Sequence, residues 1–304
     1  MRAALLLCGL VACVDASPRA PAPAWPAPPP GAYPSGPGAP PTTTTPPPPS
    51  ASSSVAPGCG QPAAAGLTTR HVQAANRDRT YLLVVPDGYD PRAPYPLVIV
   101  LHGGGGNAAG ARAQTDLEKV AAGKAVFVYP EGGGSWNLDD PAATNADVAM
   151  FDGILLATHN SLCVDPKRVF LTGFSNGAYM ANQLACRRGE RIRGVVTHAG
   201  GGPYEVNGTY DATGHLQCPG KAVAALVVHG NSDHTVLPSE GDKSIAHWTY
   251  ANRCTSSVAA AYVPPCTTFQ GCYQPVGSCR IPGLGHGLWN NAGKVTWAFF
   301  SSLP

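Results

Sequence analysis

The sequence predicts an α/β protein with a mostly parallel, doubly wound sheet, covered by helices on both faces and stapled by disulfides. Three observations support this prediction. Runs rich in Val, Ile and Leu alternate with helical patterns from Thr80 onward, as expected for parallel strands joined by crossover helices. The chain after Gly58 has ordinary globular composition and is long enough for one large domain. That part holds eight of the 10 cysteines, and an even number behind an export signal indicates disulfides.

The predicted elements follow one another along the domain. Strands are expected in the apolar runs at residues 81–85, 97–101, 125–129, 168–172, 194–197 and 223–228, with a last strand near 276–281. Between them, helices are expected at residues 113–122, 148–159, 178–187, 243–252 and 294–300. Active sites in doubly wound sheets lie at the carboxyl ends of the strands. Residues that directly follow a strand are therefore the first candidates for chemistry.

The N-terminus carries a targeting signal. An apolar stretch after Arg2 is typical of a short export signal over residues 1–12. It ends in LVAC at residues 10–13, which resembles the lipobox of bacterial lipoproteins, with Cys13 as the acylated residue. We expect a cell-surface or outer-membrane lipoprotein of a bacterium that meets the membrane only through Cys13. Ordinary cleavage after Ala16, followed by secretion, is the alternative.

A spacer and a catalytic domain follow the signal. Residues 13–57 contain half of the 32 prolines and are rich in Ala, Thr and Ser, so we expect a disordered linker. Residues 58–304 remain as one catalytic domain, expected to be a monomer. Charged residues make up only 12% and the net charge is +2, which excludes the basic surplus of a nucleic-acid protein. The sequence contains no run of about 20 apolar residues, so we do not expect a transmembrane helix.

The cysteines of the domain predict up to four disulfides whose pairing stays open. They are Cys59, Cys163, Cys186, Cys218, Cys254, Cys266, Cys272 and Cys279. A zinc site is the competing interpretation, but no two close pairs of cysteines bracket a finger-sized loop. We therefore expect neither a metal nor any other cofactor.

A serine lies at a sharp turn after a predicted strand. Strand 168–172 runs into GFSNG at residues 173–177 and then into an Ala-rich helix. Glycine at both ends of the pentapeptide permits a nucleophile elbow, which projects the Ser175 hydroxyl above the sheet edge. Because a serine hydroxyl is a weak nucleophile, a histidine must take its proton and a carboxylate must orient that histidine.

The partners of Ser175 are expected later in the chain, the acid before the histidine. Asp233 lies in the loop after strand 223–228 and is the candidate acid. His286 lies in GLGHG, between the last strand and the final helix, and is the candidate base. His247 lies within a predicted helix and is expected to be structural.

A glycine run after strand 97–101 supplies the third requirement, donors for an oxyanion. His102 is followed by four glycines, a pattern typical of the oxyanion loop of lipases and esterases. The backbone N–H groups of Gly103, Gly104 and Asn176 are the expected donors. A phosphate-binding loop is the alternative, disfavoured because no Lys followed by Ser or Thr comes after the glycines.

Further motifs join this set: YLLVVP at 81–86, YPE at 129–131, CVD at 163–165 and HG at 229–230. In this order they resemble carbohydrate esterase family 1, the secreted feruloyl esterases and polyhydroxybutyrate depolymerases. The resemblance spans about residues 58–304 and implies an α/β-hydrolase fold. It also implies ester hydrolysis by a catalytic triad of Ser175, Asp233 and His286.

The expected reaction is serine-dependent hydrolysis of polymer-linked carboxylic esters, with feruloyl esters of plant polysaccharide placed first. Polyhydroxybutyrate or another polyester is the alternative, followed by acetyl xylan and peptides. A non-catalytic surface-binding lipoprotein is disfavoured because the Ser, Asp and His are all present. Trp136 and Trp289 lie on loops expected at the active-site face, where each would stack on a phenolic ring or sugar, unless it is buried in the core.

Overall fold

The computed structural model describes residues 56–261 and 263–304, and the fold of this part rests on one sheet of ten strands. The signal 1–12, Cys13 and nearly all of the linker 13–57 lie outside the described residues. The strands are β1 (Gly66–Ala74), β2 (Arg77–Val85), β3 (Tyr95–Leu101), β4 (Val126–Pro130), β5 (Val164–Phe174), β6 (Gly194–His198), β7 (Ala224–Gly230), β8 (Val258–Ala260), β9 (Thr267–Phe269) and β10 (Val276–Ile281). The helices are α1 (Ala108–Ala113), α2 (Leu117–Ala121), α3 (Ala146–Ser161), α4 (Asn176–Arg187), the 3-10 turn η1 (Gly189–Arg191), α5 (Pro238–Ala251) and α6 (Ala292–Ser301).

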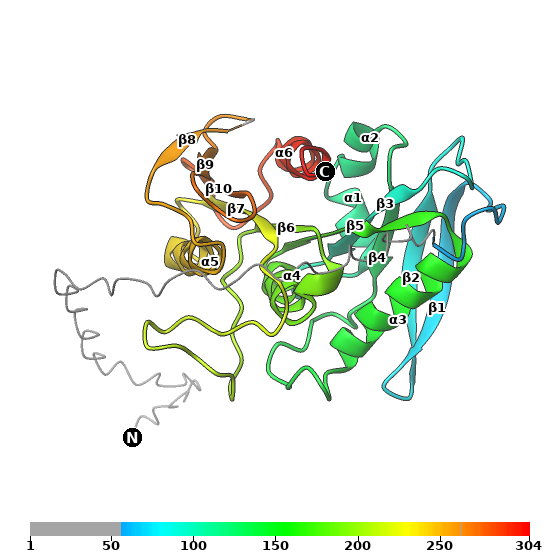
Figure 1. The fold of residues 1–304 in the computed structure, drawn as a ribbon, viewed down its shortest axis with the longest axis horizontal. Coiled ribbons are helices and arrows are strands. Elements are labelled where there is room, and N and C mark those ends of the chain that lie inside the picture. Colours follow the sequence, from blue (N-terminus) through cyan, green and yellow to red (C-terminus); the bar gives the residue numbers. More distant parts are fainter. Residues whose placement is uncertain (1–55, 262) are drawn as a thin grey trace, which may run out of the picture. The chain divides into compact units, whose positions relative to one another are not determined.

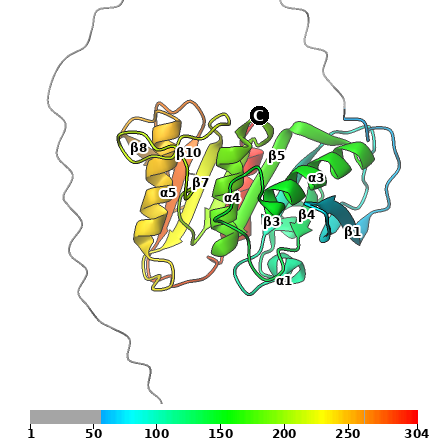
Figure 2. The same cartoon turned by 90° about the horizontal axis from the view of Figure 1, so that it is seen from below.

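The sheet is parallel at its centre and antiparallel at its edges. Its strand order is β1-β2-β4-β3-β5-β6-β7-β10-β9-β8. Neighbouring strands from β4 to β10 pair in parallel, whereas β1, β2, β9 and β8 pair antiparallel. Figures 1 and 2 show α3, α4 and α5 on one face and α1, α2 and α6 on the other. The predicted doubly wound architecture is confirmed.

Alternate residues of the central strands serve opposite faces of the sheet. In β3, Leu97, Ile99 and Leu101 belong to the core cluster that contains the apolar side chains of α3, α4 and α5. Val98 and Val100 belong to the second cluster, with those of α1, α2 and α6. A strand buried on both faces is a continuous apolar run. This is the pattern that made β3 predictable.

Three strands near the edges of the sheet, β1, β8 and β9, were not predicted. The residues of β1 are mostly exposed or half-buried, and those of β8 and β9 are entirely so. They therefore lack an apolar run. The turn from β1 to β2 also lacks the glycine that usually marks a tight hairpin turn. Ala75 and Asn76 occupy this turn instead, with positive φ angles of 49° and 60°.

The predicted helix 113–122 is right only in part: residues 117–121 form α2, but residue 113 ends a separate short helix, α1. The Asn107 side chain caps α1 by accepting the Gly110 N–H, and α1 ends at Ala113. Helix α6 then approaches the start of α2 closely. A Cβ atom added to Gly293 would overlap the Asp116 carboxylate. The tight contact with α6 coincides with the break between the two helices.

Four disulfides cross-link the domain, the largest number that was predicted. They are Cys59–Cys163, Cys186–Cys218, Cys254–Cys272 and Cys266–Cys279. The first ties the segment before β1 to the start of β5, and the second ties the end of α4 to the loop between β6 and β7. Among the helices of the described residues, none is both long and apolar enough to cross a membrane.

Candidate active site

Ser175 lies on a tight turn between β5 and α4. Its backbone has φ 54° and ψ −121°, a conformation that costs a non-glycine residue about 1–3 kcal/mol. The Ser175 N–H donates to the His198 carbonyl on the neighbouring strand at 2.9 Å. A Cβ atom on Gly173 would overlap the Gly177 carbonyl, and one on Gly177 would overlap the His102 carbonyl. Both flanking glycines are therefore required by close backbone approach, as in a nucleophile elbow.

Three of the predicted side chains meet at this turn. The Ser175 Oγ lies 2.9 Å from His286 Nε2, and His286 Nδ1 lies 2.8 Å from Asp233 Oδ2. Asp233 comes from the loop after β7, and His286 from the loop between β10 and α6. With Nδ1–H donating to the carboxylate, Nε2 is free to accept the serine proton. This is the tautomer that a general base for serine requires.

The surroundings of Asp233 keep its carboxylate charged. Burial alone would raise the pKa of Asp233, but hydrogen bonds from His286 and from the N–H groups of Val236 and Thr235 lower it below the ordinary value. Both N–H groups donate to Oδ1 at 2.9 Å. Oδ2 is thereby left to His286, so the carboxylate is ionised at neutral pH and favours one orientation of the imidazole.

A second histidine, His229, lies behind the carboxylate. Its Nε2 donates to the Val236 carbonyl at 2.9 Å and is 3.5 Å from Asp233 Oδ2. The side chain is buried, and burial lowers the pKa of His229, so the ring is neutral and braces the turn that holds Asp233. The sequence indicated residues 229–230 only as a family motif, because nothing in it told which loop the His229 ring would face.

The predicted oxyanion donors lie beside the serine. Within residues 56–261 and 263–304, the N–H groups of Gly103, Gly104 and Asn176 have no hydrogen-bond acceptor. Asn176 is the first residue of α4, and the first N–H groups of a helix lack intrahelical partners. A Cβ atom on Gly104 would lie 3.7 Å from the Asn176 Cβ. The glycine loop therefore packs against the start of α4, next to Ser175.

His102 fixes the shape of the glycine loop. Its Nδ1–H donates to the Gly103 carbonyl at 2.8 Å, and its Nε2 accepts the Gly132 N–H at 3.0 Å. The C=O and N–H of a trans peptide point in opposite directions. By holding the Gly103 carbonyl, His102 therefore turns the Gly104 N–H outward, away from its own ring.

The prediction that Trp136 stacks on substrate is wrong. Its exposed fraction is 5%, and its ring packs on the His102 ring with centroids 4.8 Å apart. Its indole N–H donates to the His102 carbonyl at 2.8 Å, and its backbone N–H donates to Asn176 Oδ1 at 2.7 Å. Trp136 is thus a buried support of the glycine loop. The sequence located its loop but not the direction of the indole.

Two further aromatic side chains lie near the histidine. The Phe174 ring, which the sequence did not indicate, lies 5.0 Å from the His286 ring between centroids. Trp289 is half-buried against the core cluster on the α6 face. A contact between Trp289 and substrate remains a prediction.

One group of metal-type ligands occurs in the part of the chain that the structure describes. The sulfurs of Cys186 and Cys218 and a ring nitrogen of His247 lie within 4.8 Å of one another. The two sulfurs are joined in a disulfide, whereas a metal ligand is a thiolate. The oxidised pair therefore does not offer a metal site, and His247 contacts the disulfide, 3.3 Å from Cys218 Sγ.

Similarity to known proteins agrees with this geometry. The Phospholipase/Carboxylesterase family profile matches residues 137–258. Feruloyl esterase C of Emericella nidulans is 34% identical over 263 residues, which cover 80% of this chain and 90% of that protein. The chain belongs to the feruloyl esterase C family. The predicted family resemblance is confirmed, and the protein is a carboxylesterase.

Other relatives of the esterase show the same likeness. A probable feruloyl esterase C of Aspergillus flavus is 34% identical, covering 73% of this chain and 84% of its own. Among solved structures, acetyl xylan esterase from Aspergillus awamori has a TM-score of 0.62 at 16% identity, covering 77% of this chain and 99% of that one. A ferulic acid esterase from Anaeromyces mucronatus has a TM-score of 0.52 at 17% identity, covering 82% and 94%. The two structures show the shared α/β-hydrolase fold.

Proposed function

We propose that the esterase hydrolyses feruloyl esters carried by plant polysaccharide, with Ser175 as nucleophile, His286 as general base and acid, and Asp233 as the orienting carboxylate. The supporting observation is the hydrogen-bond chain from Ser175 Oγ to His286 at 2.9 Å and on to Asp233 at 2.8 Å. The substrate class is supported by the feruloyl esterase C of Emericella nidulans, at 34% identity.

In the acylation step, Ser175 Oγ attacks the ester carbonyl carbon while His286 Nε2 takes the hydroxyl proton. The carbonyl electron pair moves onto its oxygen, where the N–H groups of Gly103, Gly104 and Asn176 stabilise the charge. One donor of this kind is worth about 3–4 kcal/mol in the transition state. When the intermediate collapses, the bond to the sugar oxygen breaks and that oxygen receives the proton from His286. The feruloyl group remains esterified to Ser175.

In the deacylation step, water repeats the attack. His286 Nε2 takes a proton from the water as its oxygen bonds to the acyl carbon, and the same N–H groups stabilise the oxyanion. The bond to Ser175 Oγ then breaks, and the serine recovers its proton from His286. Asp233 stabilises the imidazolium in both steps without taking the proton. Ser175 and His286 handle every proton transfer with Asp233 as the orienting charge, so the proposed scheme requires no metal or other cofactor.

Comparison of substrates tests the class. We expect the highest kcat/KM on methyl ferulate, measured beside a short nitrophenyl ester, acetylated xylan, a peptide and a polyhydroxybutyrate film. Preference for the film, for acetylated xylan or for the peptide would assign the protein to the corresponding alternative. A fluorophosphonate probe should label the wild type but not Ser175→Ala. A wild type that takes no label would favour a non-catalytic binding protein.

We also propose that the esterase is exported and anchored to a bacterial membrane through acyl chains on Cys13. The supporting observations are LVAC at residues 10–13 and the four disulfides of the domain, which form in oxidising compartments. On this proposal the folded domain itself is a monomer in the aqueous phase, and ordinary secretion after cleavage at Ala16 is the alternative.

A further inference from the structure

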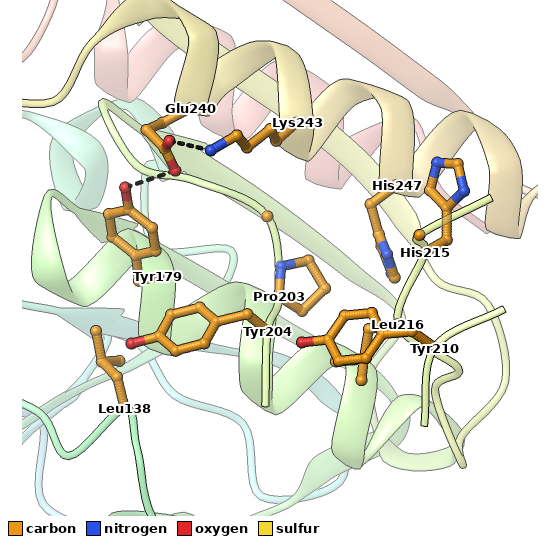
Figure 3. A pocket seen from close by; sticks show the side chains of 12 residues that line it. Leu138, Tyr179, Pro203, Tyr204, Tyr210, His215, Leu216, Glu240, Lys243 and His247 are labelled. Atoms are coloured by element: carbon orange, nitrogen blue, oxygen red, sulfur yellow. Dashed lines mark hydrogen bonds and ion pairs between the residues drawn. The ribbon is translucent and has the colours of Figure 1, made fainter. Parts of the chain in front are cut away.

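A groove lies beside the triad, between α4, α5 and the loop 199–223 that joins β6 to β7 (Figure 3). Its volume is ≈ 520 Å³, inside the range of about 300–1,000 Å³ that is usual for ligand sites. Ser175, Asp233 and His286 are not among its lining residues. We call it the tyrosine groove and define it by six of its lining side chains: Tyr179, Tyr204, Tyr210, His215, Glu240 and Lys243.

The tyrosine groove begins one helical turn from the nucleophile. Tyr179 lies in the first turn of α4, and its backbone N–H donates to the carbonyl of Ser175, the N-cap, at 3.1 Å. A side chain on a helix leans toward the N-terminus of that helix, here toward the Ser175 turn. The Tyr179 hydroxyl donates to Glu240 Oε2 at 3.2 Å, and Glu240 lies in the first turn of α5, which follows the Asp233 loop. The end of the groove formed by Tyr179 and Glu240 therefore borders the triad.

The aromatic rings of the groove are fixed by their hydroxyls. The Tyr204 hydroxyl donates to Asp139 Oδ1 at 3.1 Å. The Tyr210 hydroxyl donates to the Glu205 carbonyl at 3.0 Å and accepts the Glu205 N–H at 2.9 Å, while the residue is 43% exposed. Figure 3 shows these rings across the groove from the side chains of α5. Rings held in this way lose little conformational entropy when a ligand stacks on them.

The charges of the groove are balanced. Lys243 Nζ donates to Glu240 Oε1 at 2.5 Å, so the two formal charges pair with each other. Burial and the neighbouring Asp139 raise the pKa of Tyr204 to about 12, and its phenol is neutral. A groove without net charge does not select a polyanion. Aromatic faces beside hydroxyl and carboxylate groups instead match a sugar chain, whose rings have apolar C–H faces and a rim of hydroxyls.

We propose that the tyrosine groove binds the neutral polysaccharide that carries the scissile ester, as a subsite for the sugar side of the substrate. The identity of the polymer rests on the proposed feruloyl esterase function. The position of Tyr179 next to the Ser175 turn places bound sugar within one helical turn of the attacking oxygen. The groove therefore adds binding energy for polymer substrates and none for esters of small alcohols.

Substitution of two tyrosines of the groove, the half-buried Tyr204 and the exposed Tyr210, tests the proposal. Tyr204→Ala and Tyr210→Ala should each raise KM for feruloylated arabinoxylan about three- to tenfold, as expected for the loss of one aromatic contact. Their kcat and KM for methyl ferulate should equal those of the wild type. The matched control is Tyr273→Ala, which removes another exposed tyrosine outside the groove and should change neither substrate. The proposal would be overturned if the groove variants changed KM equally for both substrates, or if they left KM for feruloylated arabinoxylan unchanged.

Tyr204→Phe and Tyr210→Phe separate stacking from loop stability, because they keep the ring and remove the hydroxyl bonds. Because the ring stays but is less firmly held, we expect a rise in the polymer KM that is smaller than in the alanine variants; a rise as large as in the alanine variants would contradict ring stacking. Calorimetric titration with xylotetraose, which carries no ester, should show binding that the double alanine variant loses. Absence of binding to the wild type would overturn the groove proposal. Absence of methyl ferulate hydrolysis would overturn only the proposed reaction, so the two failures are distinguishable.

Discussion

The two oxygens of Asp233 have separate tasks at the candidate site. Oδ1 accepts the N–H groups of Thr235 and Val236, and Oδ2 accepts from His286. Because the backbone holds one oxygen, the other has little freedom to rotate away from the imidazole. The orientation of His286 is thus set by the loop after β7 as much as by its own loop.

We predict that Ser175→Ala and His286→Ala each reduce methyl ferulate hydrolysis to background, because the first removes the nucleophile and the second removes the base. Asp233→Asn should retain a small activity, about 10⁴-fold below wild type, since a neutral amide favours the wrong imidazole tautomer, as in serine proteases. Steady-state kinetics measures each change. The control His234→Ala should stay near wild type. Near-normal turnover by His286→Ala would contradict the assignment.

Asn176→Ala tests the support of the oxyanion loop. The substitution keeps the Asn176 backbone N–H but removes the acceptor of the Trp136 N–H and the Ser135 hydroxyl. We expect kcat on methyl ferulate to fall about tenfold, a loss near 1.4 kcal/mol, with little change in KM. Asn207→Ala, in an exposed loop, is the matched control. An unchanged kcat in Asn176→Ala would show that the side chain does not position the donors.

The sequence predicted the residues of the site better than their surroundings. Ser175, Asp233 and His286 could be found because each follows a strand in a fixed order. Trp136 was misassigned, because a loop position does not reveal whether an indole turns outward or inward. Phe174 was not assigned a role because its contact with His286 joins segments far apart in the chain. His229 precedes Asp233 by only four residues, but the sequence does not show that its ring turns toward the carboxylate.

At the level of elements, burial decided what could be predicted. The central strands are apolar on both faces, and each parallel strand from β3 to β10 was found within a few residues of its bounds. The edge strands β1, β8 and β9 have little buried surface and gave no periodic signal. The break between α1 and α2 depends on the approach of α6, which is a tertiary contact. No local pattern in residues 113–122 predicts this break.

The elbow between β5 and α4 supplies a test at this scale. Gly177→Ala would place a methyl group against the backbone oxygens of Leu101 and His102, neither of which is a flexible side chain. We expect a loss of about 3 kcal/mol or more in the free energy of unfolding, the upper part of the range for overpacking. Gly287→Ala is the control, because a Cβ there meets nothing within 4 Å. Equal thermal midpoints for the two variants would contradict the tight packing of the elbow.

Over the whole domain, stability is shared between the core and the four disulfides. The bridge from Cys59 to Cys163 spans 104 residues, whereas the bridge from Cys266 to Cys279 spans 13. Each native disulfide typically adds about 2–4 kcal/mol, against a total of about 5–15 kcal/mol for a folded domain. The oxidised state is therefore expected to be necessary for a stable domain.

Acid should destabilise the domain through two buried histidines. Burial lowers the pKa of His198 and of His247 from 6.5 to about 4, with a smaller effect of His215 on His247. Between about pH 6.5 and 4 the unfolded chain binds protons that the folded domain does not, so stability falls as pH falls. The slope is at most about 1.4 kcal/mol per pH unit for each imidazole. Denaturant unfolding at several pH values measures it.

His247→Gln should reduce this slope by up to about 1.4 kcal/mol per pH unit, because it removes one of the two buried imidazoles. A slope that His247→Gln does not alter would show that this imidazole is protonated equally in both states. The same titration above pH 7 should show no dependence on either histidine, because both states are then neutral.

Cys13→Ser tests the anchor. We expect the variant to keep the methyl ferulate activity of the wild type but to leave the membrane fraction, because acyl chains and not the domain would supply the affinity for lipid. Fractionation of cells followed by the activity assay measures both. Cys8→Ser is the control and should remain membrane-bound. Unchanged membrane attachment of Cys13→Ser would refute lipidation at this residue.

The bridge between Cys59 and Cys163 also determines how the domain bears mechanical load. The chain before residue 56 enters at this bridge, and Cys163 directly precedes β5, which has β3 and β6 as neighbours on its two sides. A pull on the N-terminal side therefore passes through a covalent bond into the middle of the sheet, and the hairpin of β1 and β2 stays outside the loaded path. Extraction of a central strand shears many hydrogen bonds at once, whereas an edge hairpin unzips bond by bond. Reduction of this one bridge should lower the force at which the domain yields, because tension then reaches the hairpin first.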